Sequence, residues 1–462
     1  MFRSLFFTSL SFVSFLALST THLSAMEGQN EDSTTSPPIH QATIEFLPEE
    51  VLLHIFASIN QRDVPSVAGT CKQWGQVMND NQLWKVYAQR AQIDLNGSPS
   101  EVNDYKALLK DLCKPSFTQI KSLEDSSLRG ISPDGSMLLG QAKAGPRVYG
   151  IKDKRRETAF TWTSTDGLIS LGVLNNGSFS SSEAASANNS VVVGNSSDGN
   201  AQKAFRWTQT DRMESLGTIN NGHMSEAEDI SADGLVIVGS SIDGAVPYDR
   251  SGSAYRAFRW TKEGGMESLS TLNNGSHSKA EGISSDSLVI VGLSADGAEH
   301  NQLRAIRWTR EDGMESLGVL PGANSSAAYG VNSDGSVIVG GSGNEPFVWT
   351  LESGMKSLGA LNNGKYGIAH AVSGDGLVVG GSANDGAQKD YPRRAFLWTA
   401  RKGMQSLEAL LMEKNLLPPH WRLSDVVAIS SDGTVLTGIG HLSTSTGTSL
   451  VWRVVLPRAT LF

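Results

Sequence analysis

Short apolar runs alternate with glycine-containing turns along most of the chain after residue 117, and this pattern returns many times. Each copy carries a Trp, usually at the end of Phe-x-Trp-Thr. The seven Trp follow one another at intervals of 41 to 54 residues: Trp162, Trp207, Trp260, Trp308, Trp349, Trp398 and Trp452. Repeats of about 40 to 50 residues built of short strands are typical of β-propeller blades. The pattern therefore predicts a mainly β protein with a seven-bladed propeller.

Each repeat can be divided into the four strands of an antiparallel blade. An inner strand ends in Ile-Ser or a related pair, and Asp-Gly follows in five copies, replaced in the others by Asn188-Asn189 and Asp286-Ser287. Such pairs favour type I′ turns with positive φ at both residues. The second strand is then expected to end in a Gly, which suits close backbone approach. This Gly is present in all seven copies: Gly140, Gly194, Gly239, Gly292, Gly340, Gly381 and Gly438.

The third and fourth strands are identified by residues eight positions apart that vary together. Arg206, Arg259 and Arg307 are matched by Glu214, Glu267 and Glu315, and where Arg is absent Glu is absent too. The remaining pairs are Val348 with Lys356, Leu397 with Gln405, and Thr161 with Ile169. Cross-strand partners in a hairpin behave in this way. These arginines are therefore predicted to have a structural role.

The two ends of the repeat region complement each other. Residues 117–123 read as a fourth strand with no third strand before it, and the last repeat ends after its third strand near Trp452. We expect residues 117–123 to complete the seventh blade beside the strand at 450–454. Such a closure removes both open edges of the ring of sheets.

Between residues 44 and 90 the apolar spacing is helical instead. Val51, Leu52, Ile55 and Phe56 form one stripe on a first helix, and Asp63 and Asp80 can cap two further helices. A bundle of about 40 residues cannot bury so many large apolar side chains internally. Part of this surface is therefore expected to dock on another element or another protein.

This segment resembles an F-box. The resemblance rests on Leu47-Pro48, Ile55-Phe56, Cys71-x-x-Trp74 and Leu83-Trp84, in the order and spacing of that motif. It implies a three-helix module that docks on the Skp-type adaptor of a cullin-RING ubiquitin ligase. The positions that would contact the adaptor are Leu47, Pro48, Ile55, Phe56, Val64, Val67 and Trp74. The alternative is a helical cap whose apolar stripe packs on the rest of the chain.

The repeats resemble the HAF-type repeat of bacterial extracellular proteins and are similar to kelch blades. Kelch-like propellers usually bind proteins at a loop face, so the resemblance implies a protein target. Insertions between the second and third strands lie at 144–156, 244–253 and 383–394. Insertions on one face of a repeat array often form its binding surface. The candidate target-binding residues are Tyr248, Asp249, Arg250, Asp390, Tyr391 and Arg393, and the alternative is solvated loop decoration.

The N-terminus has the pattern of a secretory signal. Arg3 precedes an uncharged apolar run from Leu5 to Leu18, which is short for a membrane span. The expected organisation is a signal-like export segment at 1–25, a disordered linker at 26–43, the F-box-like domain at 44–90, a helical connector at 91–116 and the propeller at 117–456. No stable membrane span is expected.

Composition excludes several kinds of function. With a net charge of −9 and a pI near 5.5, the protein has no net positive potential that would attract a phosphate backbone, so nucleic acid is not expected as a partner. The two Cys and nine His follow neither a repeat nor a metal-ligand spacing, and no catalytic motif is present. We therefore expect no enzyme activity, no cofactor and no metal site.

Two functions remain open. The first is a substrate-recruiting F-box subunit of an SCF-type ubiquitin ligase, with the propeller binding the target protein. The second is a secreted or surface propeller that binds glycan or protein outside the cell. An intracellular bacterium that exports the protein as an effector into the host cytoplasm would reconcile the signal-like segment with the F-box.

Overall fold

The structure is a computed structural model that describes residues 115–123, 126–143, 156–246, 255–388, 392–444, 449–456 and 461. The chain divides into two compact units, Met1–Cys113 and Lys114–Phe462, and all described residues belong to the second. The predicted signal-like segment, linker, F-box-like helices and connector up to residue 114 lie outside the described residues.

The described residues form seven four-stranded antiparallel sheets, which confirms the predicted blades. Six sheets have their strands in chain order. They are β2 to β5 (Ser127–Ile131, Leu138–Lys143, Glu157–Thr163, Gly167–Gly172), β6 to β9 (Ser180–Ala185, Val191–Ser197, Gln202–Thr208, Arg212–Ser215) and β10 to β13 (Ser225–Ile230, Ile237–Ile242, Tyr255–Thr261, Gly265–Ser268). The next three are β14 to β17 (Ser278–Ile283, Ile290–Asp296, Gln302–Thr309, Gly313–Ser316), β18 to β21 (Ser326–Val331, Val337–Ser342, Glu345–Thr350, Gly354–Ser357) and β22 to β25 (Gly367–Val372, Val379–Asn384, Arg393–Thr399, Gly403–Ser406).

The seventh sheet closes the ring. It contains β26 (Trp421–Ile429), β27 (Val435–Leu442), β28 (Leu450–Val455) and, beside β28, the early strand β1 (Ser116–Gln119). Phe117 pairs with Val454 and Gln119 with Trp452, as the two incomplete ends of the repeat region predict. The strand is shorter than expected, because residues Lys121–Leu123 form a 3-10 turn (η1).

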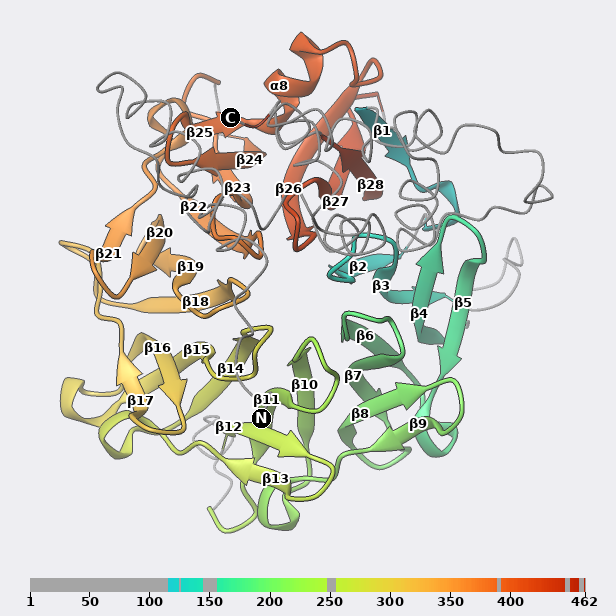
Figure 1. The fold of residues 1–462 in the computed structure, drawn as a ribbon, viewed down its shortest axis with the longest axis vertical. Coiled ribbons are helices and arrows are strands. Elements are labelled where there is room, and N and C mark those ends of the chain that lie inside the picture. The colour runs from blue at the N-terminus through green and yellow to red at the C-terminus, as the bar shows by residue number, and fades with distance from the viewer. Residues whose placement is uncertain are drawn as a thin grey trace, which may run out of the picture. The chain divides into compact units, whose positions relative to one another are not determined.

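The inner strands β2, β6, β10, β14, β18, β22 and β26 surround the centre of the ring (Figure 1). Each contacts the inner strands of its neighbours, and β2 contacts β26, so the ring is complete. Apolar clusters join adjacent sheets; one of them packs Val193 of β7 against Ile237 of β11 and Phe258 of β12. Burial of apolar side chains between adjacent sheets therefore holds the blades together.

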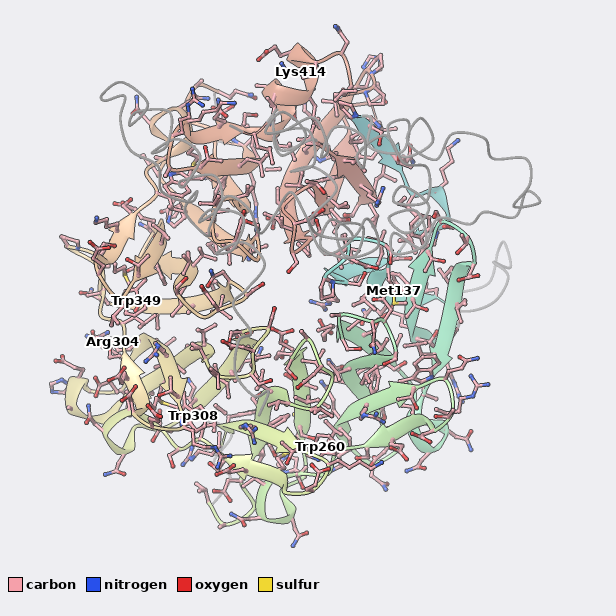
Figure 2. The ribbon with its side chains drawn as sticks, viewed as in Figure 1. Met137, Trp260, Arg304, Trp308, Trp349 and Lys414 are labelled. Carbon is pink, nitrogen blue, oxygen red and sulfur yellow. The ribbon has the colours of Figure 1, made fainter. Side chains whose placement is uncertain are left out.

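The repeated aromatic residues of the third strands divide into two groups. Phe160, Phe205, Phe258, Phe347 and Phe396 are fully buried, and so is Trp452. Trp260, Trp308 and Trp349, which Figure 2 labels on successive blades, are half-buried and pack on the edge of the clusters. Trp452 therefore belongs to the core, whereas these three Trp contribute to it only in part.

The turn that follows each inner strand differs from the predicted type I′ turn. Gly135 has a φ of 75°, but Asp134 is not among the residues with positive φ. The N–H of Gly135 donates to the carbonyl of Ser132 at 2.8 Å, and the Asp134 carboxylate accepts from the N–H of Ser136 at 3.0 Å. The Asp thus binds its own turn with its side chain, as Asp and Asn often do.

This bonding explains why Asp or Asn stands first in the turn in every copy while the second residue varies. The residues concerned are Asp134, Asn188, Asp233, Asp286, Asp334, Asp375 and Asp432. The prediction was wrong because it rested on the dipeptide alone and ignored the side-chain hydrogen bond.

The invariant Gly lies inside the second strand and does not end it, since β11 continues from Ile237 to Ile242 through Gly239. A Cβ on Gly239 would overlap the carbonyl oxygen of Glu226 on the inner strand. The same overlap with the inner strand occurs at all seven positions. The predicted close backbone approach is confirmed.

In several second strands this Gly begins a Gly-x-Ser sequence, and the Ser has a structural role. Ser196, Ser241 and Ser294 each accept a hydrogen bond from the N–H of a leucine or isoleucine, Leu174, Ile219 or Leu272, at 2.9 to 3.0 Å. Those residues begin the 3-10 turns η2 (Leu174–Asn176), η3 (Ile219–Asn221) and η4 (Leu272–Asn274), which carry the Asn-Asn-Gly sequence. The serines therefore hold the connections between blades.

The predicted cross-strand register is confirmed in all six hairpins. Arg206 lies opposite Glu214, Arg259 opposite Glu267 and Arg307 opposite Glu315. Val348–Lys356, Leu397–Gln405 and Thr161–Ile169 occupy the equivalent places. The Arg307 guanidinium is 3.3 Å from the Glu315 carboxylate, whereas the corresponding distance for Arg206 and Glu214 is 4.0 Å.

In the part of the chain described, no helix is long and apolar enough to cross a membrane.

Candidate functional site

A ring of bulged residues lies on the seven inner strands. In each blade the register between inner and second strand shifts by one residue at the same place, and the seventh blade has one further shift at Ser424. The residue left out of the pairing is Arg129, Glu183, Glu228, Glu281, Tyr329, His370 or Val427, in blade order. Bulges re-aim a side chain and occur often beside active sites. In six of the seven blades the side chain at this position is polar or aromatic, and in the seventh it is Val427.

Charge gathers on one side of this ring. The Lys279 ammonium is 2.9 Å from the Glu228 carboxylate and 3.2 Å from that of Glu281. The guanidinium of Arg129 is 3.9 Å from Glu183, and the side-chain amide of Gln202 donates to Glu226 at 2.6 Å. We call Arg129, Glu183, Glu226, Glu228, Lys279 and Glu281 the axial cluster. It contains four carboxylates and two cations.

Burial and mutual repulsion make some of these carboxylates hold protons. Burial raises the pKa of Glu183 to about 7, and the neighbouring charge of Glu228 acts in the same direction. Burial also raises the pKa of Glu281 to about 7, although Lys279 opposes the shift. Glu228 and Glu281 together raise the pKa of Lys279 above its usual value despite its burial. Glu183 and Glu281 therefore titrate near neutral pH.

Asp229 lies next to this cluster but has a structural role. Its carboxylate accepts hydrogen bonds from the N–H of Ile230 at 2.8 Å and of Ile283 in the next blade at 2.9 Å. Burial raises its pKa to about 6, and these two hydrogen bonds oppose the shift. The contact ties two adjacent blades together.

A pH-dependent stability follows for the axial cluster. Because the folded-state pKa of Glu183 lies near 7 and its ordinary value is 4.5, the folded protein binds more protons between these values. Stability is therefore lost as the pH rises through this window. We expect Glu183→Gln to raise the free energy of unfolding by ~1–3 kcal/mol at pH 8.5 and to change it little at pH 4.5.

Denaturant unfolding of the two proteins at both pH values tests this expectation. Glu315→Gln is the matched control, since Glu315 is an exposed carboxylate with a side-chain exposure of 53%. An equal effect of Glu183→Gln at both pH values would contradict the buried-charge explanation.

The two ends of each blade carry different connections, because successive connections in an antiparallel sheet lie at opposite ends. The Asp-Gly-type turns and the turns between third and fourth strands form one face, which we call the turn face. The loops between second and third strands and the 3-10 turns between blades form the other, the loop face. Among the predicted target-binding residues, Arg393 begins β24 and lies at the edge of the loop face.

Of those residues, the structure describes Arg393, while Tyr248, Asp249, Arg250, Asp390 and Tyr391 lie outside the described residues. The Arg393 guanidinium donates to the Asp425 carboxylate at 2.7 Å, and the side chain is 54% exposed. His370 Nε2 is 3.4 Å from the same oxygen, whereas Asp425 Oδ1 is buried without a hydrogen-bond partner. Arg393 therefore links the start of β24 to the inner strand β26 through Asp425, and more than half of its side chain remains exposed.

Sequence reasoning missed the axial cluster, although a signal was present. In every repeat the ring residue stands two positions before the Ile or its equivalent that ends the inner strand, and six of the seven copies have a charged or aromatic residue there. Among the described residues no group of three or more His, Cys, Asp or Glu could hold a metal ion.

Residues 44–90 match a family model described as F-box-like. No curated protein matches this chain. TolB from Acinetobacter baumannii is 16% identical, with 50% of this chain and 53% of the TolB chain covered and a TM-score of 0.34. An oligogalacturonate lyase in complex with manganese is 14% identical over 72% of this chain and 89% of its own, with a TM-score of 0.47.

An oligogalacturonate lyase from Vibrio parahaemolyticus is 10% identical over 74% of this chain and 94% of its own, with a TM-score of 0.48. The family match covers the segment in which the sequence predicts three short helices. The chain thus combines an F-box-like segment with a closed seven-bladed β-propeller.

Proposed function

We propose that this protein is a non-catalytic substrate receptor, in which the F-box-like segment docks on a Skp-type adaptor of a cullin-RING ubiquitin ligase and the propeller binds the target. The observation that carries the proposal is the F-box-like match at 44–90 directly before a propeller with closed blades. The F-box-like segment carries more large apolar side chains than a bundle of about 40 residues can bury, so part of its surface is expected to dock on another protein.

The propeller supplies a rigid support for target contacts. Its blades are joined by buried apolar clusters, and the loops between second and third strands vary more in length from blade to blade than the strands do. Binding residues are commonly placed on variable loops held by a rigid scaffold. Target recognition is therefore assigned to the propeller and adaptor recognition to the helices.

Copurification of the full chain with a purified Skp-type adaptor tests the proposal. We expect a stable complex with the wild-type protein and its loss in the double variant Leu47→Ala with Pro48→Ala, because these residues lead the F-box-like apolar surface. Arg393→Ala is the control, since it changes the loop face and should leave adaptor binding intact.

Two outcomes would overturn this function. If the wild-type chain binds no Skp-type adaptor, the competing function as an extracellular propeller for glycan or protein is favoured. If the double variant binds as well as the wild type, the helices have a capping role and the adaptor contact lies elsewhere.

A further inference from the structure

Three of the seven turns that follow the inner strands expose a leucine to solvent on the turn face. Leu235 and Leu288 are each 65% exposed, and Leu377 is 50% exposed. All three stand before the second strand begins, at Ile237, Ile290 and Val379 respectively. Because these leucines lie outside the strands, the preference of strands for large apolar side chains does not explain them.

The other four blades show which residue type stabilises the turn at this position. Their residues are Ser136, Ser190, Ser336 and Thr434, and each hydroxyl donates to the Asp or Asn of its own turn at 2.5 to 2.8 Å. A leucine cannot form this bond. The third, fourth and sixth blades therefore lack a local hydrogen bond and expose an apolar side chain, which indicates a surface for contact with another molecule.

The turns that carry these leucines lie in one arc with the turn of the fifth blade. The N–H of Ala232 donates to the carbonyl of Ser285 at 3.3 Å, and the hydroxyl of Ser285 donates to that of Ser333 at 3.2 Å. The N–H of Ser333 in turn donates to the carbonyl of Gly374 at 3.0 Å. The turns of the third, fourth, fifth and sixth blades are thus in direct contact, each with the next.

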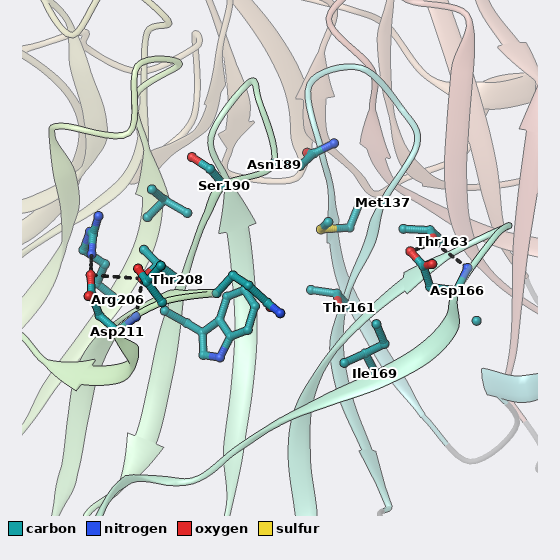
Figure 3. Close-up of a pocket in the computed structure, with 15 residues that line it drawn as sticks. Met137, Thr161, Thr163, Asp166, Ile169, Asn189, Ser190, Arg206, Thr208 and Asp211 are labelled. Atoms are coloured by element: carbon teal, nitrogen blue, oxygen red, sulfur yellow. Dashed lines mark hydrogen bonds and ion pairs between the residues drawn. The ribbon is translucent and has the colours of Figure 1, made fainter. Parts of the chain in front are cut away.

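The first two blades present a different surface. Figure 3 shows Ser190 of the second blade at the position of the leucines, beside a hollow of about 470 Å³ that Asp166 and Asn189 also line. Neither of these blades has a leucine after the turn. The exposed leucines are therefore confined to one side of the ring.

The arc is acidic as well as apolar. Its four turns carry the exposed residues Asp233, Asp286, Asp334 and Asp375, and no Lys or Arg stands at 231–236, 284–289, 332–337 or 373–378. The N–H of each leucine donates to the carboxylate of its own turn at 2.9 to 3.1 Å, so each apolar side chain lies next to a negative charge. Hydrogen bonds from Ser336 lower the pKa of Asp334, which keeps this carboxyl ionised at neutral pH. We call these three leucines and four aspartates the leucine arc.

We propose that the leucine arc binds an amphipathic segment of the target protein whose large apolar side chains are flanked by Lys or Arg. The apolar side chains cover the three leucines, and the cations lie beside the turn carboxylates. A second copy of the chain that docked through the same face would bring Asp against Asp, which is unfavourable. As a surface for the target, the arc rests on the proposed function, and it lies on the face opposite the insertion loops.

Fluorescence anisotropy of a labelled amphipathic peptide of Leu and Lys, titrated with the full chain, tests the proposal. We expect saturable binding of this peptide, and much weaker binding when Glu replaces its Lys or Gln replaces its Leu. The triple variant Leu235→Ser, Leu288→Ser and Leu377→Ser should weaken binding about tenfold or more, because it removes the apolar contact without changing the charge. Its free energy of unfolding should be unchanged or higher, since each Ser can form the hydroxyl bond of the other blades.

Two further variants separate charge from apolar contact and provide a control. Asp233→Asn combined with Asp286→Asn should weaken binding about fivefold at low salt. The turns should be retained, because Asn188 accepts the same backbone hydrogen bond in the second blade, at 3.1 Å. Tyr366→Ser changes a side chain that is 54% exposed on the loop face, in the connection before β22, and should have no effect.

Four outcomes would overturn the proposal: no binding by the wild-type chain, equal binding by the triple variant, equal binding of the Glu peptide, and self-association of the wild type that the triple variant loses. The last would identify a second copy as the occupant. No adaptor is present in this experiment, so its failure is distinguishable from failure of the F-box-like segment to bind.

Discussion

Gly340→Ala should destabilise the propeller by ~3 kcal/mol or more, whereas Gly341→Ala, one residue later on the same strand, should be neutral or stabilising. A Cβ on Gly340 would overlap the carbonyl oxygen of Ala327 and lie 2.9 Å from the Cα of Ala328. Both atoms belong to the backbone of the inner strand, so neither can move without disturbing the ladder. Overpacking against backbone is therefore the physical cause.

Gly341 is the matched control for this effect. Its Cβ would meet only the side chain of Ile368, at 3.8 Å and beyond, which is ordinary van der Waals contact. Denaturant unfolding of the two variants at one pH measures the difference. If both substitutions changed the free energy of unfolding equally, strand propensity and not close approach would explain the invariant Gly.

Ile120→Pro should open the ring at the seventh blade and lower the free energy of unfolding by ~3–5 kcal/mol. The N–H of Ile120 donates to the carbonyl of Val451 at 3.1 Å, and its side chain is 3% exposed in the cluster that joins the seventh and first blades. Proline removes the donor and the isoleucine volume together. Loss of β1 would also expose the edge of β28, so concentration-dependent association is expected.

Ile120→Val separates the two contributions, because it keeps the hydrogen bond and removes one methylene group. It should lower the free energy of unfolding by only ~0.5–1.5 kcal/mol and leave the protein monomeric in light scattering, provided that the wild type is monomeric. If Ile120→Pro were as stable as Ile120→Val, closure by β1 would not be what stabilises the ring.

Much of the blade plan could be predicted because each repeat supplies an independent copy of the same interactions. The exchange of Arg206 and Glu214 for Val348 and Lys356 identifies cross-strand partners before any coordinates exist. The closure by residues near 117 follows in the same way from strands that are missing at either end. Comparison within the chain is effective here because paired residues share one environment and vary together.

The turns show that a two-residue motif is not enough to predict the type of a turn. Asp-Gly alone favours a type I′ turn, but Ser132 and Ser136 offer hydroxyl and amide donors to Asp134 and stabilise another geometry. The competing hydrogen bonds involve residues on both sides of the dipeptide. They are visible in the sequence as Ser-x-Asp-Gly, and this longer pattern would have favoured the observed turn.

By itself, the sequence determined the number of blades, the pairing of their outer strands, the closure of the ring and the F-box-like segment at 44–90. Only the tertiary structure decided that Lys279 contacts both Glu281 of its own blade and Glu228 of the preceding blade, and that Asp166 and Asn189 line one hollow. The reason is that these residues belong to different blades, so the order of residues within one repeat does not show which of them meet. Contacts between blades depend on how the ring closes, and no repeat encodes them locally.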